Sequence, residues 1–240
     1  MSGERGTIRK IFDIGPAAVT SNNTFDGSSA PTTVWSNGIL QPGASGTNGV
    51  LWLTQLSESV ADNGRVGISI AAETLDVRLK INPQDSLTGN NHLRMLIVAD
   101  NECDGVVPDI TEILGDTASA ATTVNTGLEI SLLQPAYFGR FHIIEDKNWY
   151  WYSIASGSVP SYSEMRSPIH FYHEAHHDLK SHRVMWDVTD ASAITNARKG
   201  HIFAYFIYSS TSVATGGLPV VVTTNPPAIQ WTTRLRYRDA

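Results

Sequence analysis

Hydrophobic and polar residues alternate along much of this 240-residue chain. In the clearest run, from Leu75 to Ile81, every second residue is apolar, and Asp76, Arg78 and Lys80 occupy the positions between. Because successive side chains of a strand point to opposite faces, this run predicts a strand with one buried and one solvated face. A second predicted strand, residues 93–100, is apolar on both faces, which favours a central strand covered on both sides. Related patterns predict strands over residues 7–14, 50–56, 66–71, 137–146, 183–188, 201–208 and 229–238.

Turn-forming residues separate the predicted strands, as in Asp62-Asn63-Gly64. One short helix is predicted over residues 109–114, with Asp109 as its N-cap and Gly115 at its C-terminal end. No internal repeat or change of composition marks a boundary, so residues 1–240 are expected to form one domain. About eight strands with long polar insertions predict an all-β fold, a single eight-stranded jelly-roll β-sandwich of two antiparallel sheets. Its outward-facing loops are expected among residues 21–49, 82–91, 153–168 and 209–227.

Composition narrows the class of protein. The single cysteine, Cys103, excludes an intramolecular disulfide, and a chain of this length buries enough surface to fold without one. Charged residues make up only 17% of the sequence, which suits large contacts between subunits, because interface cores exclude charge. The net charge of −6 disfavours a freestanding nucleic-acid-binding domain, which is normally basic. The N-terminal segment lacks the apolar stretch of a signal peptide, and no apolar run approaches the roughly 20 residues that span a bilayer, so no membrane association is expected.

Residues 173–177 match the H-E-x-x-H signature of zinc metalloproteases. That chemistry requires His173 and His177 on one face of a helix, with Glu174 activating a metal-bound water. Pro168 leaves little room for a long helix, and no glutamate after Glu174 can complete the ligand set. We therefore interpret the segment as a polar, histidine-rich loop or strand edge. The alternatives are metal binding through His173 and His177, and zinc-dependent hydrolysis.

An acidic cluster is the other candidate metal site. Asp100, Glu102, Asp104 and Asp109 lie close together around Cys103, and carboxylate oxygens suit a hard cation. The acids that flank Cys103 are expected to raise the pKa of its thiol and to disfavour a nucleophilic role. A solvated acidic turn is the favoured interpretation, with a divalent cation as the alternative. Neither a Gly-x-Ser-x-Gly motif nor a phosphate-binding glycine loop occurs, so no catalytic residue, cofactor or enzymatic activity is expected.

An aromatic run is a candidate contact with other subunits. Trp149, Tyr150, Trp151 and Tyr152 place large side chains on both faces of one strand, which favours a subunit interface. The alternative is that the tryptophans fill the core and the tyrosines face outward.

The last predicted strand carries three arginines on one face, at every second position. Because like charges repel, we expect an anionic partner, either phosphate or acids of a neighbouring subunit, with a solvated face as the third alternative. With the basic residues near the N-terminus, these arginines form the candidate nucleic-acid-binding set. Its members are Arg5, Arg9, Lys10, Arg234, Arg236 and Arg238.

Four segments give the chain a resemblance to a known family. They are residues 64–81, residues 92–114, residues 139–147, and residues 198–205 with the terminal residues 234–239. In their order and spacing the chain resembles the single jelly-roll coat proteins of small viruses with circular single-stranded DNA genomes, the group that encodes a rolling-circle replication initiator. Such proteins usually begin with a long Arg/Lys-rich arm, which this chain does not show.

The resemblance implies a capsid protein that assembles with copies of itself into an icosahedral shell of roughly 60 copies or a multiple. The shell would enclose the viral genome, expected to be single-stranded DNA, without reading its sequence, and would present loops to a host-cell receptor. The expected location is the virion, after assembly inside the host cell, with the nucleus as candidate compartment. The alternatives are a carbohydrate-binding β-sandwich, such as a lectin or receptor-binding domain, and the zinc hydrolase considered above.

Overall fold

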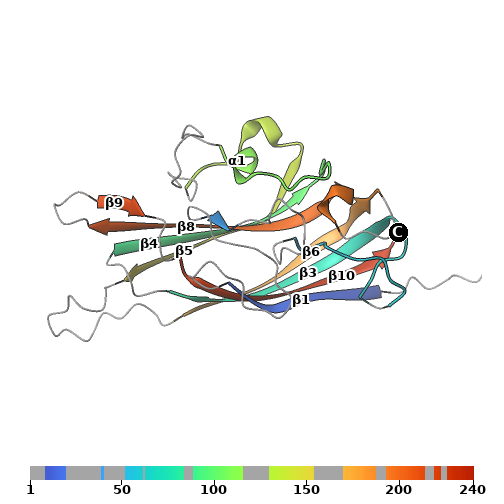
Figure 1. The fold of residues 1–240 in the computed structure, drawn as a ribbon, viewed down its shortest axis with the longest axis horizontal. Helices are drawn as coiled ribbons and strands as arrows, with labels where there is room; N and C mark the ends of the chain where they lie inside the picture. Colours follow the sequence, from blue (N-terminus) through green and yellow to red (C-terminus); the bar gives the residue numbers. More distant parts are fainter. Residues whose placement is uncertain are drawn as a thin grey trace, which may run out of the picture.

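Two antiparallel sheets lie face to face in the computed structural model, which describes residues 9–19, 39–40, 52–61, 63–83, 89–115, 130–153, 170–187, 193–213, 219–222 and 226–240. Sheet A has the strand order β1-β10-β3-β6-β7, and sheet B has the order β2-β8-β4-β5, with β9 also paired to β8. Figure 1 shows the two layers edge-on, with α1 on the outer side of sheet B. The elements are β1 (Arg9–Val19), β2 (Ile39–Leu40), β3 (Ser69–Asn82), β4 (Gly89–Asp100), α1 (Ile110–Ile113), a 3-10 turn (Pro135–Tyr137), β5 (Phe141–Ser153), β6 (Phe171–Trp186), a second 3-10 turn (Ile194–Asn196), β7 (Ala197–Lys199), β8 (His201–Val213), β9 (Pro219–Val222) and β10 (Ala228–Asp239).

The strand order is that of a jelly roll. If β7 and β9 are set aside, the other eight described strands number 1 to 8 along the chain, and the sheets read 1-8-3-6 and 2-7-4-5. Every link between consecutive strands crosses from one sheet to the other, except the link from β4 to β5. All the pairs are antiparallel. The predicted all-β jelly-roll sandwich is therefore confirmed.

Alternating side chains of both sheets fill the space between them. In β10, Trp231, Leu235 and Tyr237 are buried in this core, as Thr233 is, and the alternate residues Thr232, Arg234 and Arg236 face away from it. Leu93 and Met95 of β4 approach the same core from sheet B. Each buried side chain of this size stabilises the fold by about 1.5–3 kcal/mol.

A second apolar cluster lies on the other side of sheet B. Leu96 and Val98 of β4 pack there with Phe203 of β8, beneath Ile110 and Ile113 of α1. This layer explains why β4 is apolar on both faces, and the prediction of a central strand covered on both sides is confirmed. No helix in the described part of the chain is long and apolar enough to span a membrane.

Some predicted boundaries differ from the structure. The strands predicted over residues 66–71 and 75–81 are one strand, β3, in which a register shift between Ala72 and Thr74 resets the alternation. The strand predicted over residues 50–56 was wrong for the described residues 52–56, which make one isolated bridge and a turn. Asp109 is confirmed as the N-cap of α1, but Leu114 in an extended conformation ends the helix, so Gly115 is not its C-cap.

The predicted loops lie largely outside the described residues. Where the structure describes them, the loop predictions were wrong at residues that belong to strands: 39–40 (β2), 82 (β3), 89–91 (β4), 153 (β5) and 209–213 (β8). Residues 219–222 form β9, paired to β8.

Candidate functional site

The arginines of β10 lie on the outer side of sheet A, between β1 and β3. Arg234 donates two hydrogen bonds of 2.8 Å each to the carboxylate of Asp13 on β1. Arg236 donates from Nη1 to Asp76 Oδ2 at 2.8 Å on β3. Acids of the same chain therefore offset the repulsion between the arginines, an arrangement that the sequence interpretation did not include.

The remaining charged groups extend this network. Arg238 donates to Ser181 Oγ at 3.0 Å, and its Nε lies 3.6 Å from Glu73 Oε1. Arg9 contacts the other oxygen of Glu73 at 3.1 Å. Arg9, Arg234, Arg236 and Arg238 are thus on one exposed face, as the nucleic-acid interpretation requires.

Ionisation of the acids follows from these contacts. The hydrogen bond from Arg234 lowers the pKa of Asp13, against the opposing effect of burial. Burial acts to raise the pKa of Asp76. The hydrogen bond from His176 and the charge of Arg236 outweigh this effect, so the pKa of Asp76 is lowered. Both carboxylates are therefore charged at neutral pH.

Lys10 does not belong to this face. Its side chain is buried at the end of the sandwich, where Nζ donates to the Gly64 carbonyl at 2.9 Å and lies 2.9 Å from Asp239. The interpretation of Lys10 as a nucleic-acid contact is corrected, because alternation along β1 turns it inward. Arg5 lies outside the described residues.

The outer side of sheet A carries an excess of positive charge, unlike the chain as a whole. On the side away from the core, β1, β3, β6 and β10 carry eight basic and five acidic side chains, whereas the whole chain has 17 basic and 23 acidic residues. A hollow of about 470 Å³ opens in this face, and its charged lining consists of Arg78, Arg234 and Arg236 with the acids Asp13, Asp76 and Glu174, beside His176. The basic residues are Arg9, Arg78, Lys80, Lys180, Arg183, Arg234, Arg236 and Arg238, and the acidic residues are Asp13, Glu73, Asp76, Glu174 and Asp178.

The aromatic run on β5 alternates between core and solvent. Trp149 and Trp151 are buried in the inter-sheet core, whereas Tyr150 and Tyr152 are 66% and 49% exposed. Tyr150 stacks on His92 at a centroid distance of 4.2 Å. The alternative in which the tryptophans fill the core is confirmed, so only the two tyrosines are placed to contact another molecule.

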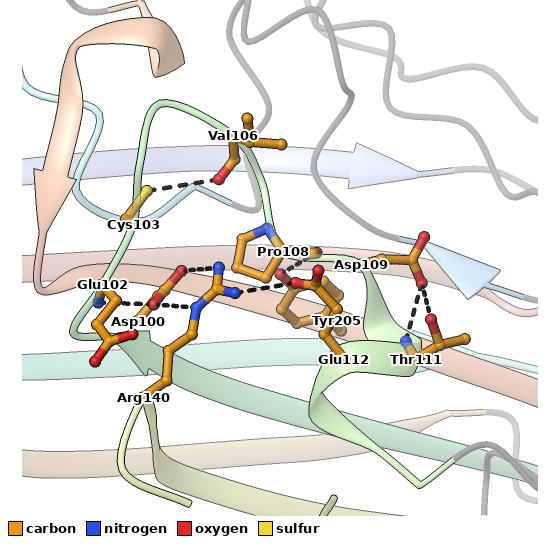
Figure 2. Close-up of polar contacts among 10 residues, drawn as sticks. All are labelled: Asp100, Glu102, Cys103, Val106, Pro108, Asp109, Thr111, Glu112, Arg140 and Tyr205. Atoms are coloured by element: carbon orange, nitrogen blue, oxygen red, sulfur yellow. Dashed lines mark hydrogen bonds and ion pairs between the residues drawn. The ribbon is translucent and has the colours of Figure 1, made fainter. Parts of the chain in front are cut away.

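The acidic cluster around Cys103 forms a structural contact between β4 and β5 (Figure 2). Asp100 is fully buried and accepts two hydrogen bonds from Arg140, at 3.0 and 2.9 Å. Arg140 also contacts Glu112 of α1 at 3.4 Å. Burial and the nearby Asp100 raise the pKa of the Cys103 thiol to about 12, so it is not a thiolate at neutral pH.

This geometry does not favour the alternative of a cation site, and the favoured interpretation of a solvated acidic turn was wrong for Asp100, which is fully buried. Asp100 is committed to Arg140, Asp104 is paired with Arg198, and Asp109 caps α1. Glu102 contributes its backbone N–H to Asp100 at 2.9 Å. In the described ranges no three His, Cys, Asp or Glu side chains are arranged to hold a metal ion.

The H-E-x-x-H segment lies in β6 and is not helical. His173 and His177 point between the sheets, where both contact Glu145 of β5, at 2.6 and 2.9 Å. Glu174 points to the opposite side and pairs with Arg78 at 2.7 Å. Because Glu174 and the two histidines lie on opposite faces of the strand, they cannot hold and activate one metal-bound water, so the protease arrangement does not form. The interpretation of the segment as a polar, histidine-rich strand edge is confirmed.

Sequence reasoning missed one surface feature. Of the twelve large apolar side chains exposed in the described residues, eight belong to the connections β2–β3 and β4–β5. Both connections join strand ends at the same end of the sandwich, since β3 and β5 begin where β4 ends. The signal that could have indicated these eight side chains is the presence of several large apolar residues within otherwise polar connecting segments. They are Val60, Val66, Ile68, Val106, Ile130, Leu132, Tyr137 and Phe138.

A scan against protein-family models finds no match, and no curated protein matches the sequence. Similar solved structures include the unassembled VP1 pentamer of Merkel cell polyomavirus, with 11% identity, a TM-score of 0.26, and coverage of 100% of this chain and 97% of that chain. VP1 of that virus in its virus-like particle aligns with 12% identity and a TM-score of 0.25, over 99% of this chain and 74% of that chain. Similarities of this size carry no argument about function, and the jelly-roll assignment rests on the strand order.

Proposed function

We propose that this protein is the coat subunit of a small icosahedral virus, which assembles with copies of itself into a shell around the nucleic-acid genome. The observation that carries the proposal is the set of exposed apolar side chains in two connections of a jelly roll, β2–β3 and β4–β5. Val60 is 94% exposed and Leu132 84% exposed, so neither contributes to the core of the single subunit. Large apolar groups left exposed on a single subunit are typical of surfaces that contact another protein.

Assembly follows from the geometry of such contacts. The connections β2–β3 and β4–β5 are different surfaces, so a contact between one on a subunit and the other on its neighbour is heterologous and closes only through symmetry. Each subunit of a closed shell makes several contacts, and their multivalency stabilises the particle even when each contact is modest. The resemblance to coat proteins of single-stranded DNA viruses supports the genome type.

Substitution of the two most exposed apolar side chains tests the proposal. In the variant V60S/L132S, each contact loses an apolar group whose burial contributes about 1–3 kcal/mol, so we expect the concentration needed for assembly to rise at least tenfold. The melting temperature of the subunit should stay unchanged, because both side chains are exposed in it. Electron microscopy and size-exclusion chromatography measure the particles.

The control is Tyr172→Ser, which removes an aromatic side chain that is 69% exposed on the outer side of sheet A. Particles should form as in the unmodified protein. Unchanged assembly of V60S/L132S would contradict the proposed contact. A small fixed oligomer under all conditions would contradict the shell itself and favour the carbohydrate-binding alternative, for which Tyr150 on His92 offers an exposed aromatic ring.

A further inference from the structure

We infer that the outer side of sheet A is the genome-facing surface of the shell and binds the phosphates of single-stranded nucleic acid. This inference rests on the proposed function, because only a closed shell gives the subunit an inner side. Eight basic and five acidic side chains occupy this face in a chain whose net charge is −6. The rest of the molecule therefore carries a large excess of acid, and a polyanion is attracted to this face and repelled elsewhere.

Arg234 and Arg236, which line the hollow, each keep guanidinium N–H donors available for a phosphate. Arg234 uses Nε and Nη2 on Asp13, and Arg236 uses Nη1 on Asp76 and Thr74. Arg234 Nη1 and Arg236 Nη2 make no hydrogen bond to any described residue. Exposed ion pairs of this kind contribute little to stability, so a phosphate can add to them or displace a carboxylate at small cost.

An aromatic side chain beside the hollow favours single-stranded over double-stranded nucleic acid. Tyr172 of β6 is 69% exposed and stands opposite Lys80 of β3, whose Nζ lies 5.8 Å from the ring centroid. A basic track combined with an exposed ring is the arrangement that binds a backbone by charge and unpaired bases by stacking.

The face is less suited to a protein partner. Of the twelve exposed large apolar side chains in the described residues, only Ile11 and Tyr172 lie on it. Interface cores between proteins are depleted of charge and rich in apolar groups, whereas this face is dense in charge. No described element covers the outer side of sheet A (Figure 1).

The test measures binding of a labelled single-stranded oligo(dT) to unassembled subunits by fluorescence anisotropy across a salt series. In R234Q/R236Q, loss of two phosphate contacts should reduce the slope of log K against log salt by about 1.4. Near 0.1 M salt this corresponds to binding about 25-fold weaker. Tyr172→Ala should weaken binding about tenfold without changing the slope, because stacking is not a charge effect.

Two further variants control the experiment. Arg198→Gln removes an arginine that is also exposed and paired with carboxylates, but lies at the end of the sandwich, and it should leave the slope unchanged. R234K/R236K keeps the charge and should keep the slope, which separates loss of phosphate contact from loss of fold.

An unchanged slope in R234Q/R236Q overturns the inference, whether or not shells form. Loss of assembly in that variant with intact oligo(dT) binding also overturns it, because the face would then contact protein. Failure of the unmodified protein to assemble would sink the proposed function, whereas the slope reports on nucleic-acid binding by this face alone.

Discussion

His201, the first residue of β8, is fully buried where the two sheets meet the β2–β3 connection. Its Nε2 donates to the Met185 carbonyl at 2.8 Å, and its Nδ1 accepts from Trp52 Nε1 at 3.1 Å. One ring nitrogen therefore donates and the other accepts, which requires the neutral form. Burial lowers the pKa of His201 to about 3, and the nearby cation of Arg65 acts in the same direction.

This histidine predicts a loss of stability in mild acid. Between pH 6.5 and about 3 the unfolded chain binds a proton at His201 that the folded protein does not, so the free energy of unfolding decreases as the pH is lowered through this range. The slope expected from one such group is about 1.4 kcal/mol per pH unit. Urea unfolding at several pH values should show this slope reduced in His201→Gln and retained in the control His142→Gln, whose side chain is exposed. Equal slopes in the two variants would contradict the neutral buried form.

At the scale of elements, one ion pair joins the end of β4 to the start of β5. Asp100 is fully buried and Arg140 is 21% exposed, and Arg140 also reaches Glu112 on α1. Tyr205 of β8 donates to the Pro108 carbonyl at 2.9 Å just before the helix (Figure 2). These contacts hold the β4–β5 connection against the outer side of sheet B. Five of the exposed apolar side chains belong to this connection.

Removal of the buried carboxylate charge should therefore destabilise the protein. Asp100→Asn leaves Arg140 with one weaker partner, and we expect a loss of about 2 kcal/mol in the free energy of unfolding, less than for a fully buried pair because Arg140 meets solvent. The control Asp104→Asn affects a carboxylate that is 89% exposed and should change stability by less than about 0.5 kcal/mol. The comparison uses equilibrium urea denaturation, and equal effects of the two substitutions would argue against an anchoring role for Asp100.

Elements with a regular alternation of apolar residues could be predicted from the sequence. β3 and β10 show that alternation, whereas β4 and β8 are recognisable as long apolar runs because they are buried on both faces. β6 was recognised only from residue 183, although it begins at Phe171, because His173 and His177 occupy inward positions where a polar contact with Glu145 replaces apolar packing.

The pairing on the charged face could not be predicted in this way. Asp13 and Arg234 are more than 200 residues apart in sequence and meet because β1 and β10 pair in one register. That register depends on the whole sandwich and has no local signal. The sequence indicated which face of β10 is basic, but the neighbouring strands decide what stands beside each arginine.

At the scale of the whole molecule, apolar and basic surfaces are separate. Eight of the twelve exposed large apolar side chains of the described residues belong to the connections β2–β3 and β4–β5, and basic side chains are concentrated on the outer side of sheet A. Under the proposed function, the first surface holds subunits together and the second holds nucleic acid. The two contacts should therefore respond differently to salt, because apolar contacts are not screened and phosphate contacts are.

Salt should therefore separate assembly from packaging. A rise from about 0.1 M to about 1 M shortens the Debye length from about 10 to about 3 Å. Screening weakens the repulsion between subunits of net charge −6, so particles should persist and form at lower protein concentration. The nucleic acid captured during assembly should fall over the same range, because each phosphate contact steepens the salt dependence of binding. Light scattering reports the particles, and the ratio of absorbance at 260 and 280 nm reports their nucleic-acid content. Dissociation of shells at high salt would show that charge, rather than the apolar side chains of the two connections, holds the subunits together.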